Sequence, residues 1–302
     1  MGDVIGASHA IHLTSAVGQN NITIVDDATV SSLNHAIRLD GIGNTIINDG
    51  SVSSFSASGI YATDDFNQVY NAGTITSGGF GLIAGAIITG KSSLVMNSGS
   101  LTGKQDGIRA EASANITNTG SIFAQEKGIS LANSTGQSEV LNSGQISSDD
   151  KGIDAFHNLL VTNSVLNSGE ISAGLNGVQL TGDSALVRST GDITAFNNGV
   201  VIGHSGKVIN AGVISAGGDG ISTLASIGSV SIINTGQIVS GTNGVISKQI
   251  TSIQNAGLIT AEGIGISLEI GGSSARNTGV IQSTSSAISI ADNSTVINSG
   301  TL

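Results

Sequence analysis

Val140-Leu141-Asn142-Ser143-Gly144-Gln145-Ile146 is one copy of a motif that recurs along the whole chain of 302 residues. Its centre, Asn-x-Gly-x followed by Ile, Val or Leu, starts at Asn48, Asn71, Asn97, Asn118, Asn142, Asn167, Asn210, Asn234, Asn255, Asn277 and Asn298. Two variants extend the series: Ser189-Thr190-Gly191 fills the one long gap, and Asp26-Asp27-Ala28 precedes the first copy. Repetition at a near-constant period predicts a solenoid or array rather than an ordinary globular domain.

A second signature, Gly or Ala followed by Ile, Val or Leu, alternates with the first. It begins at Ala10, Ala36, Gly59, Gly81, Gly107, Gly128, Gly152, Gly177, Gly199, Gly220, Gly244, Gly265 and Ala287. From the first signature to the second the spacing is ten residues in eleven of twelve complete units, whereas the return spacing varies from 11 to 16 residues. We therefore expect insertions on one side of each repeat only.

Aliphatic side chains flank each Asn position at fixed offsets, two residues before it and four after it, as Val140 and Ile146 flank Asn142. Period-two spacing places them on one face of short strands, with small polar residues on the other. Strands that return every 21 to 26 residues can pair in parallel with their copies in the next turn. The absence of proline agrees, because each interior strand must donate to its neighbour. The predicted fold is all-β, a right-handed parallel β-helix (β-solenoid) of about thirteen coils.

The repeated asparagine has the strand parity of the inward aliphatic residues. A buried amide needs partners for its donor and acceptor groups, and a copy one coil above and below supplies them. We therefore predict an internal asparagine ladder at the eleven Asn positions given above. The glycine two residues later, and the glycine of the second signature, are expected to permit bends at the corners of the coil.

The repeats span the chain, so residues 1–302 are expected to form a single solenoid domain. Residues 1–13 and 298–302 are incomplete half-coils, and each has the part that the other lacks. If Leu302 of one molecule abutted Ile5 of another, the spacing from Asn298 to the next Ala10 would be ten residues, as it is within the chain. Head-to-tail stacking into a filament is the resulting hypothesis. Truncation of a longer protein would leave similar ends.

Charge and composition exclude several classes of partner. The formal net charge of −11 argues against nucleic acid and anionic lipid as partners. The most apolar stretch, Gly79 to Gly90, is broken by glycine and is too short to span a membrane, so no membrane insertion is expected. The chain has no cysteine, which is compatible with any compartment. Its first ten residues show no signal-peptide pattern.

Units such as residues 140–146 resemble the low-complexity β-helix repeats of bacterial autotransporter and filamentous-haemagglutinin-like passenger regions. The resemblance covers the whole chain and is one of repeat type. It implies a secreted protein, extracellular or on the bacterial cell surface, and it specifies no particular activity.

Pectin-lyase-like enzymes share this scaffold, so catalysis is the main rival interpretation. It needs carboxylates that converge on one face and a cleft that binds sugar. The acidic pairs Asp26-Asp27, Asp64-Asp65 and Asp149-Asp150 lie at different phases of the coil, and two Tyr, six Phe and no Trp offer little surface for stacking on sugars. We predict no catalytic residue and no cofactor.

Three further features are candidate sites. A charge cluster, expected to form solvated pairs between coils, comprises Lys104, Gln105, Asp106, Gln125, Glu126, Lys127, Asp149, Asp150 and Lys151. His9 and His35 occupy equivalent positions one coil apart, with His12 nearby, which makes a metal or pH-sensing site conceivable. His157 and His204 are isolated, and no metal site is predicted. Ile87-Ile88 and Leu159-Leu160 are expected in the longest variable arms, as packing or lateral contacts.

The sequence therefore predicts a non-catalytic extracellular structural protein that serves as a filament subunit or as the stalk of a surface adhesin. Its expected partner is itself, in a head-to-tail homo-oligomer. One alternative is an adhesin that binds cell-surface or matrix glycans through variable loops around Ile87 and Leu159. A polysaccharide lyase or hydrolase is the other.

Overall fold

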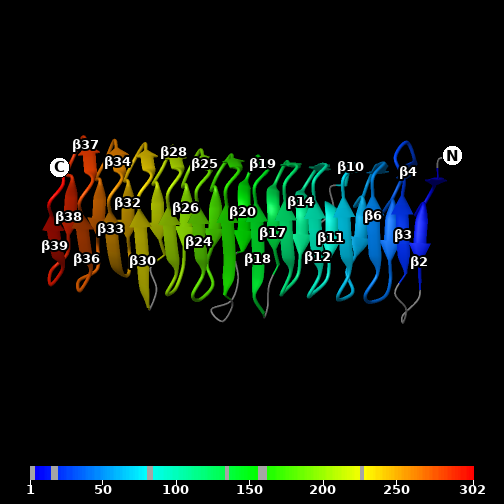
Figure 1. Cartoon of the computed structure of the whole chain (residues 1–302), viewed down its shortest axis with the longest axis horizontal. Helices are drawn as coiled ribbons and strands as arrows, with labels where there is room; N and C mark the ends of the chain where they lie inside the picture. Colours follow the sequence, from blue (N-terminus) through cyan, green and yellow to red (C-terminus); the bar gives the residue numbers. More distant parts are fainter. Residues whose placement is uncertain (1–3, 15–19, 80–83, 133–135, 156–161, 225–227) are drawn as a thin grey trace. The chain divides into compact units, whose positions relative to one another are not determined.

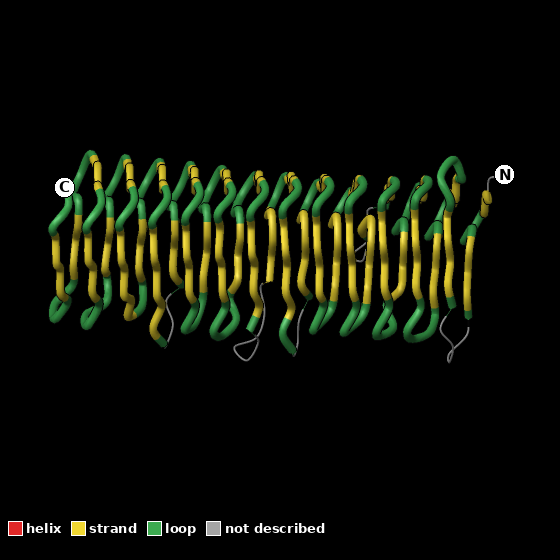
Figure 2. The backbone as a smooth tube through the Cα atoms, viewed as in Figure 1, coloured by secondary structure: helices red, strands yellow, loops and turns green. Residues whose placement is uncertain are grey.

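The computed structural model describes residues 4–14, 20–79, 84–132, 136–155, 162–224 and 228–302. These residues form strands joined by turns and loops, and they contain no helix (Figure 2). The chain is a parallel β-solenoid of about thirteen coils, and each coil contributes one strand to each of three sheets. The predicted fold class is thus confirmed. The coils group into two compact units, Met1–Asp154 (unit 1) and Ala155–Leu302 (unit 2), which are described separately.

In unit 1, each strand lies beside its equivalent in the next coil (Figure 1). Sheet 1 contains β1 (Val4–Gly6), β4 (Thr29–Ser32), β7 (Ser51–Ser54), β10 (Thr74–Ser77), β13 (Ser100–Gly103), β16 (Ser121–Ala124) and β19 (Gln145–Ser148). Sheet 2 contains β2 (Ile11–Leu13), β5 (Ile37–Leu39), β8 (Ile60–Ala62), β11 (Gly85–Thr89), β14 (Asp106–Ala110), β17 (Lys127–Leu131) and β20 (Lys151–Ala155). Sheet 3 contains β3 (Asn21–Ile24), β6 (Thr45–Asn48), β9 (Gln68–Asn71), β12 (Leu94–Asn97), β15 (Asn115–Asn118) and β18 (Ser138–Asn142).

Unit 2 repeats the same three sheets. Sheet 1 contains β22 (Glu170–Ala173), β25 (Asp192–Ala195), β28 (Val213–Ala216), β31 (Gln237–Ser240), β34 (Leu258–Ala261) and β37 (Val280–Ser283). Sheet 2 contains β23 (Val178–Leu180), β26 (Val200–Ile202), β29 (Ile221–Thr223), β32 (Val245–Ser247), β35 (Ile266–Leu268) and β38 (Ile288–Ile290). Sheet 3 contains β21 (Asn163–Asn167), β24 (Leu186–Ser189), β27 (Lys207–Asn210), β30 (Ser229–Asn234), β33 (Ile250–Asn255), β36 (Ser274–Asn277) and β39 (Thr295–Asn298).

The core of each unit consists of aliphatic side chains stacked in columns. In sheet 3, Val95 pairs in register with Val69 and Ile116, and in sheet 1, Ile75 pairs with Leu101. All five side chains are buried. Burial of each such side chain stabilises the fold by about 1.5–3 kcal/mol relative to exposure. The core positions expected two residues before and four residues after Asn are therefore confirmed in these coils.

One coil of unit 1 departs from the predicted spacing. The sequence pattern placed the second signature at Gly81, which lies outside the described residues, but the strand pairs show Ile87 opposite Ile60 and Ile108. The second signature of this coil is therefore Ala86-Ile87, fifteen residues after Asn71. The insertion lies between sheets 1 and 2, so the prediction of insertions on one side only is wrong here.

This shift also changes the role of Ile87 and Ile88. Both side chains are buried in β11, so they do not belong to a variable arm and are not available for lateral contacts. Leu159-Leu160 lie outside the described residues. The prediction of one domain for residues 1–302 remains a prediction.

Candidate functional site

The asparagine ladder is present in both units. In each rung the side-chain Nδ2 donates to Oδ1 of the asparagine in the next coil, at 2.7–2.8 Å, from Asn48 to Asn142 in unit 1 and from Asn210 to Asn298 in unit 2. From Asn71 to Asn142, and again from Asn210 to Asn298, Nδ2 also contacts the carbonyl oxygen of the glycine two residues later. The ladder therefore has a direction, with donors pointing toward the C-terminal coil.

The ladder breaks where a rung lacks asparagine. Opposite Asn48 the preceding coil places Ile24, not the Asp26 that the sequence pattern indicated, because the turn after β3 is two residues longer. Asp26 and Asp27 lie on that exposed turn. The other gap is at Ser189, as predicted, where Asn167 Nδ2 donates to Ser189 Oγ at 3.1 Å.

Both gaps leave the next asparagine without a donor. Ile24 has no polar group, and Ser189 Oγ donates to the carbonyl oxygen of Gly191 at 2.9 Å. The Oδ1 atoms of Asn48 and Asn210 are accordingly buried and have no hydrogen-bond partner. A buried polar atom in this state costs free energy comparable to a lost hydrogen bond.

The glycine of the first signature lies so close to the main chain of the preceding coil that a side chain does not fit there. In Gly99 a Cβ atom would lie 2.0 Å from the carbonyl oxygen of Gly73, and in Gly144 it would lie 2.1 Å from that of Gly120. Neither residue has the positive φ that requires glycine. The prediction of a conformational role is therefore wrong, because close approach between successive coils excludes a side chain.

A second amide column, which the sequence interpretation missed, lies at the turn before the second signature in unit 2. Asn176 Oδ1 accepts the main-chain N–H of Asn198, Asn198 Oδ1 accepts that of Asp219, and Asn243 Oδ1 accepts that of Ile264, at 3.1–3.2 Å. Asp219 Oδ1 completes the series by accepting from Asn243. The signal was available, since Asn-Gly or Asp-Gly recurs at this turn.

The outward face of sheet 3 is less polar than predicted. The residue before each ladder asparagine points outward, and in unit 1 this column includes Ile47, Tyr70, Met96 and Leu141. Ile47, Met96 and Leu141 are 38 %, 42 % and 38 % exposed. The expectation of small polar residues on this face is therefore wrong for the column of residues that directly precede the ladder asparagines.

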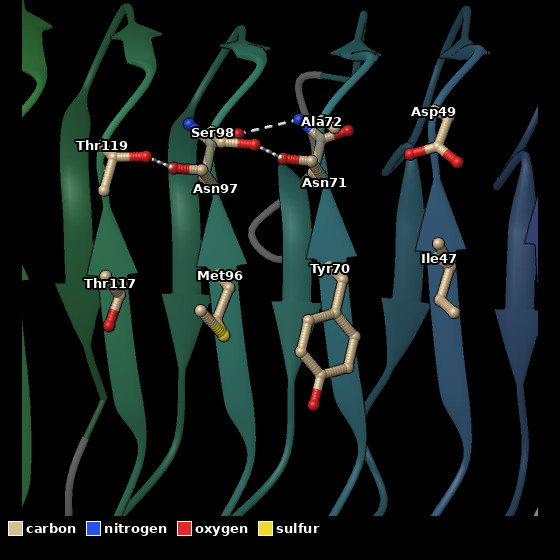
Figure 3. A pocket seen from close by; sticks show the side chains of 10 residues that line it. All are labelled: Ile47, Asp49, Tyr70, Asn71, Ala72, Met96, Asn97, Ser98, Thr117 and Thr119. Carbon is tan, nitrogen blue, oxygen red and sulfur yellow. Dashed lines mark hydrogen bonds between the residues drawn. The ribbon is translucent and has the colours of Figure 1, made fainter. Parts of the chain in front are cut away.

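A shallow groove of about 170 Å³ follows this column (Figure 3). Ile47, Tyr70 and Met96 form one row on successive strands, and Asp49 and Ser98 belong to a second row beside them. The Tyr70 hydroxyl donates to Gln68 Oε1 at 2.8 Å. The groove thus offers one aromatic ring and several oxygen atoms in a shallow surface.

The predicted charge cluster forms in unit 1 around two carboxylates that are buried. Lys127 Nζ lies 2.9 Å and Lys151 Nζ lies 3.5 Å from Asp154 Oδ2, and Arg109 lies 3.9 Å from Asp106. Asp154 and Arg109 were not among the predicted members. Since Asp106 is 4 % exposed and Asp154 is 3 % exposed, the expectation of solvated pairs is wrong for these two residues.

The pKa values of two members of this cluster, Asp106 and Lys127, are shifted. Desolvation raises the pKa of Asp106 to about 6, although the nearby charges of Lys127 and Arg109 oppose the shift. Burial disfavours the ammonium of Lys127, but its hydrogen bond to Asp154 and the charges of Asp154, Asp106 and Asp150 together outweigh burial, so the pKa of Lys127 is raised.

The predicted histidine pair is part of a larger ring cluster in unit 1. His9 and His35 stack with ring centroids 5.6 Å apart, His12 meets His9 edge-on at 5.0 Å, and Tyr61 lies 4.4 Å from His35. Arg38 lies over the Tyr61 ring, 5.6 Å from its centroid. The equivalence of His9 and His35 is therefore confirmed. His157 lies outside the described residues.

No family model matches this chain, and no curated protein or solved structure does either.

The three acidic pairs lie in three different connections of the described chain. Asp26-Asp27 follow β3, Asp64-Asp65 lie between β8 and β9, and Asp149-Asp150 lie between β19 and β20. In the part of the chain that the structure describes, no group of three or more His, Cys, Asp or Glu side chains could hold a metal ion. No helix among the same residues is long and apolar enough to cross a membrane.

Proposed function

We propose that this chain is a non-catalytic, extracellular structural β-solenoid that serves as a filament subunit or as the stalk of a bacterial surface adhesin. The observation that carries the proposal is the asparagine ladder. Its buried side-chain amides are bonded to their copies in neighbouring coils, at 2.7–2.8 Å. Such a network uses polar groups to stiffen a stack rather than to present them to a substrate.

The type of repeat supports the extracellular part of this proposal. The units resemble those of autotransporter and filamentous-haemagglutinin-like passenger regions, which act outside the bacterial cell. The net charge of −11 also favours solubility, and it disfavours binding to nucleic acid and to anionic lipid.

The last coil of unit 2 suggests how the two structural roles differ. Ile290 in β38 and Val296 in β39 are 46 % and 36 % exposed, whereas Leu268 and Ala275, their equivalents one coil earlier, are buried. Solenoids cover such a surface with a cap or with another coil. Further coils of the same polypeptide would fit a stalk, and a second copy would fit a filament subunit.

Negative-stain electron microscopy of the purified protein over a range of concentrations tests these roles. Long unbranched fibres that grow with concentration would support the filament subunit, whereas particles of one size at every concentration would support the stalk. Depolymerisation of an acidic polysaccharide by the purified chain would contradict the non-catalytic assignment.

A second candidate function is glycan binding, and the groove on sheet 3 favours it (Figure 3). A sugar ring can stack on Tyr70 while hydroxyl groups bond to Asp49 and Ser98. Tyr70→Ala should then abolish binding on a glycan array, while Thr102→Ala on the outer face of sheet 1 should leave it unchanged. Equal binding by both variants would exclude this groove.

A further inference from the structure

The imidazole of His35 occupies a position that unit 2 fills with an amide. His35 precedes Ala36 of the second signature, just as Asn198 precedes Gly199. His35 Nδ1 accepts the main-chain N–H of Ser58 in the next coil at 3.2 Å, and Asn198 Oδ1 accepts the main-chain N–H of Asp219 at 3.2 Å. The two side chains thus accept hydrogen bonds from equivalent main-chain N–H groups, each in the coil that follows.

This hydrogen bond fixes the protonation of His35. A main-chain N–H can only donate, so Nδ1 must keep its lone pair and the ring must be neutral. A proton on Nδ1 would place two N–H groups against each other and would leave the N–H of Ser58 without its acceptor. Asparagine at this position has no such sensitivity to pH.

The charges around His35 also disfavour its cationic form. The ring centroid of His9 lies 5.6 Å and that of Tyr61 lies 4.4 Å from that of His35, and Arg38 lies in β5. Burial, followed by the charges of His9 and Arg38, lowers the pKa of His35 to about 4. Burial and the neighbouring His12 lower the pKa of His9 as well.

The nearby carboxylates do not form an ion pair that would stabilise the protonated form of His35. Asp40 is held by His12 at 2.8 Å and by Arg38 at 2.9 Å, and the hydrogen bond from His12 keeps the pKa of Asp40 below its usual value. Asp64 of the next coil accepts the main-chain N–H of Gly41. Asp40 is therefore engaged with His12 and Arg38 rather than with His35.

We propose that the ring cluster of His9, His12, His35 and Tyr61 is an acid-sensitive clasp, which holds the first three coils of unit 1 together at neutral pH and loosens them in acid. The open form binds protons more readily than the closed form, because the folded environment disfavours the imidazolium of His35. The contribution of His35 to the stability of these coils is therefore constant above pH 6.5, falls as the pH drops toward 4, and changes little below that.

Hydrogen–deuterium exchange of the full chain at pH 7.5 and pH 4.5 tests the proposal, with rates corrected for the intrinsic effect of pH. Peptides that cover β2, β5 and β8 should lose protection by roughly tenfold in acid, less than the full pKa shift allows, because the site is only half-buried. Peptides that cover β23, β26 and β32 of unit 2, where Asn176, Asn198 and Asn243 replace the imidazole, should change by less than about twofold.

His35→Asn is the matched variant, since unit 2 already uses asparagine at this place. It keeps an acceptor for the N–H of Ser58 and should remove most of the acid effect on β2, β5 and β8. If the wild type keeps its protection at pH 4.5, or if His35→Asn loses protection as the wild type does, the proposal is wrong.

A direct titration covers the case in which the variant does not fold. Nuclear magnetic resonance of the ring carbons in the wild type should give His35 a midpoint well below that of a free imidazole, roughly 6.5. A midpoint at that ordinary value would overturn the clasp even without any variant.

Discussion

Ile24 lies directly opposite Asn48 in sheet 3, so the first asparagine of the unit 1 ladder has an acceptor for its Nδ2 in the next coil but no donor for its own Oδ1. The same defect recurs at Asn210, which follows Ser189. Each break lies where the repeated sequence departs from asparagine, and the unsatisfied atom always belongs to the next rung. The direction of the ladder explains this, because every rung donates toward the C-terminal coil.

Ser189→Asn should stabilise unit 2. The new amide would accept from Asn167 and donate to the Oδ1 of Asn210, which now lacks a partner. We expect a gain of about 1 kcal/mol in the free energy of unfolding, measured by chemical denaturation. Ser189→Ala is the control and should reduce stability, since it removes the acceptor of Asn167. No gain from the asparagine would mean that the orphaned oxygen is already satisfied by solvent.

Asn142→Leu should destabilise unit 1. Asn118 Nδ2 donates to Asn142 Oδ1 at 2.8 Å, and leucine would leave that buried donor with a weaker set of partners. We expect a loss of about 1–3 kcal/mol in a denaturant melt. Leu141→Ala changes the outward neighbour, which is 38 % exposed, and should cost much less. An unchanged denaturation midpoint for Asn142→Leu would mean that the asparagine ladder does not stabilise the fold.

Gly144→Ala should be among the most damaging single-methyl changes in unit 1. The added Cβ would lie 2.1 Å from the carbonyl oxygen of Gly120, so two successive coils would have to move apart. We expect a loss of more than about 2 kcal/mol, comparable to overpacking in a core. Ser143→Ala, one residue earlier on an exposed turn, should be nearly neutral in the same thermal melt. A tolerated alanine at Gly144 would show that the coils have room to separate.

Asp106→Asn should stabilise unit 1 at neutral pH. Burial raises the folded-state pKa of Asp106 to about 6 from an ordinary value of 3.8, so the folded state favours the neutral acid. The resulting cost appears as the pH rises through this interval and is complete above it. The variant should therefore gain about 1–3 kcal/mol at pH 8 and nothing at pH 3.

Denaturation of Asp106→Asn at pH 3 and pH 8 measures this difference directly. Asp192→Asn, which changes an exposed carboxylate of unit 2, is the matched control. An equal effect of Asp106→Asn at both pH values would mean that Asp106 is ionised in the fold without penalty.

Much of the fold could be predicted because the repeat is frequent and the rule of side-chain parity is simple. Val95 and Ile116 point inward beside Asn97 and Asn118, as period-two spacing requires. The predictions failed where two local patterns competed. Gly81 and Ala86 both begin the second signature in sequence, and only the pairing of Ile87 with Ile60 and Ile108 decides between them.

The candidate sites were harder to predict for a related reason. Residues 106, 127 and 151 could be placed in successive coils from spacing, but Asp154 meets Lys127 only because the coils are in register. Burial of Asp106 also depends on what packs around it, and no local pattern encodes that. The stacking of His9 on His35 was predictable, whereas the approach of Tyr61 required the third coil.

The sequence by itself determined the parallel β-solenoid, the number of coils and the asparagine ladder, because a repeated strand with one aliphatic face has few ways to bury that face. The tertiary structure alone decided the register of the coil that contains β11, the side of its insertion and the burial of Asp106 and Asp154. Those features depend on hydrogen bonds and contacts between residues some 20 or more positions apart, whose free energy does not appear in any local stretch of the chain.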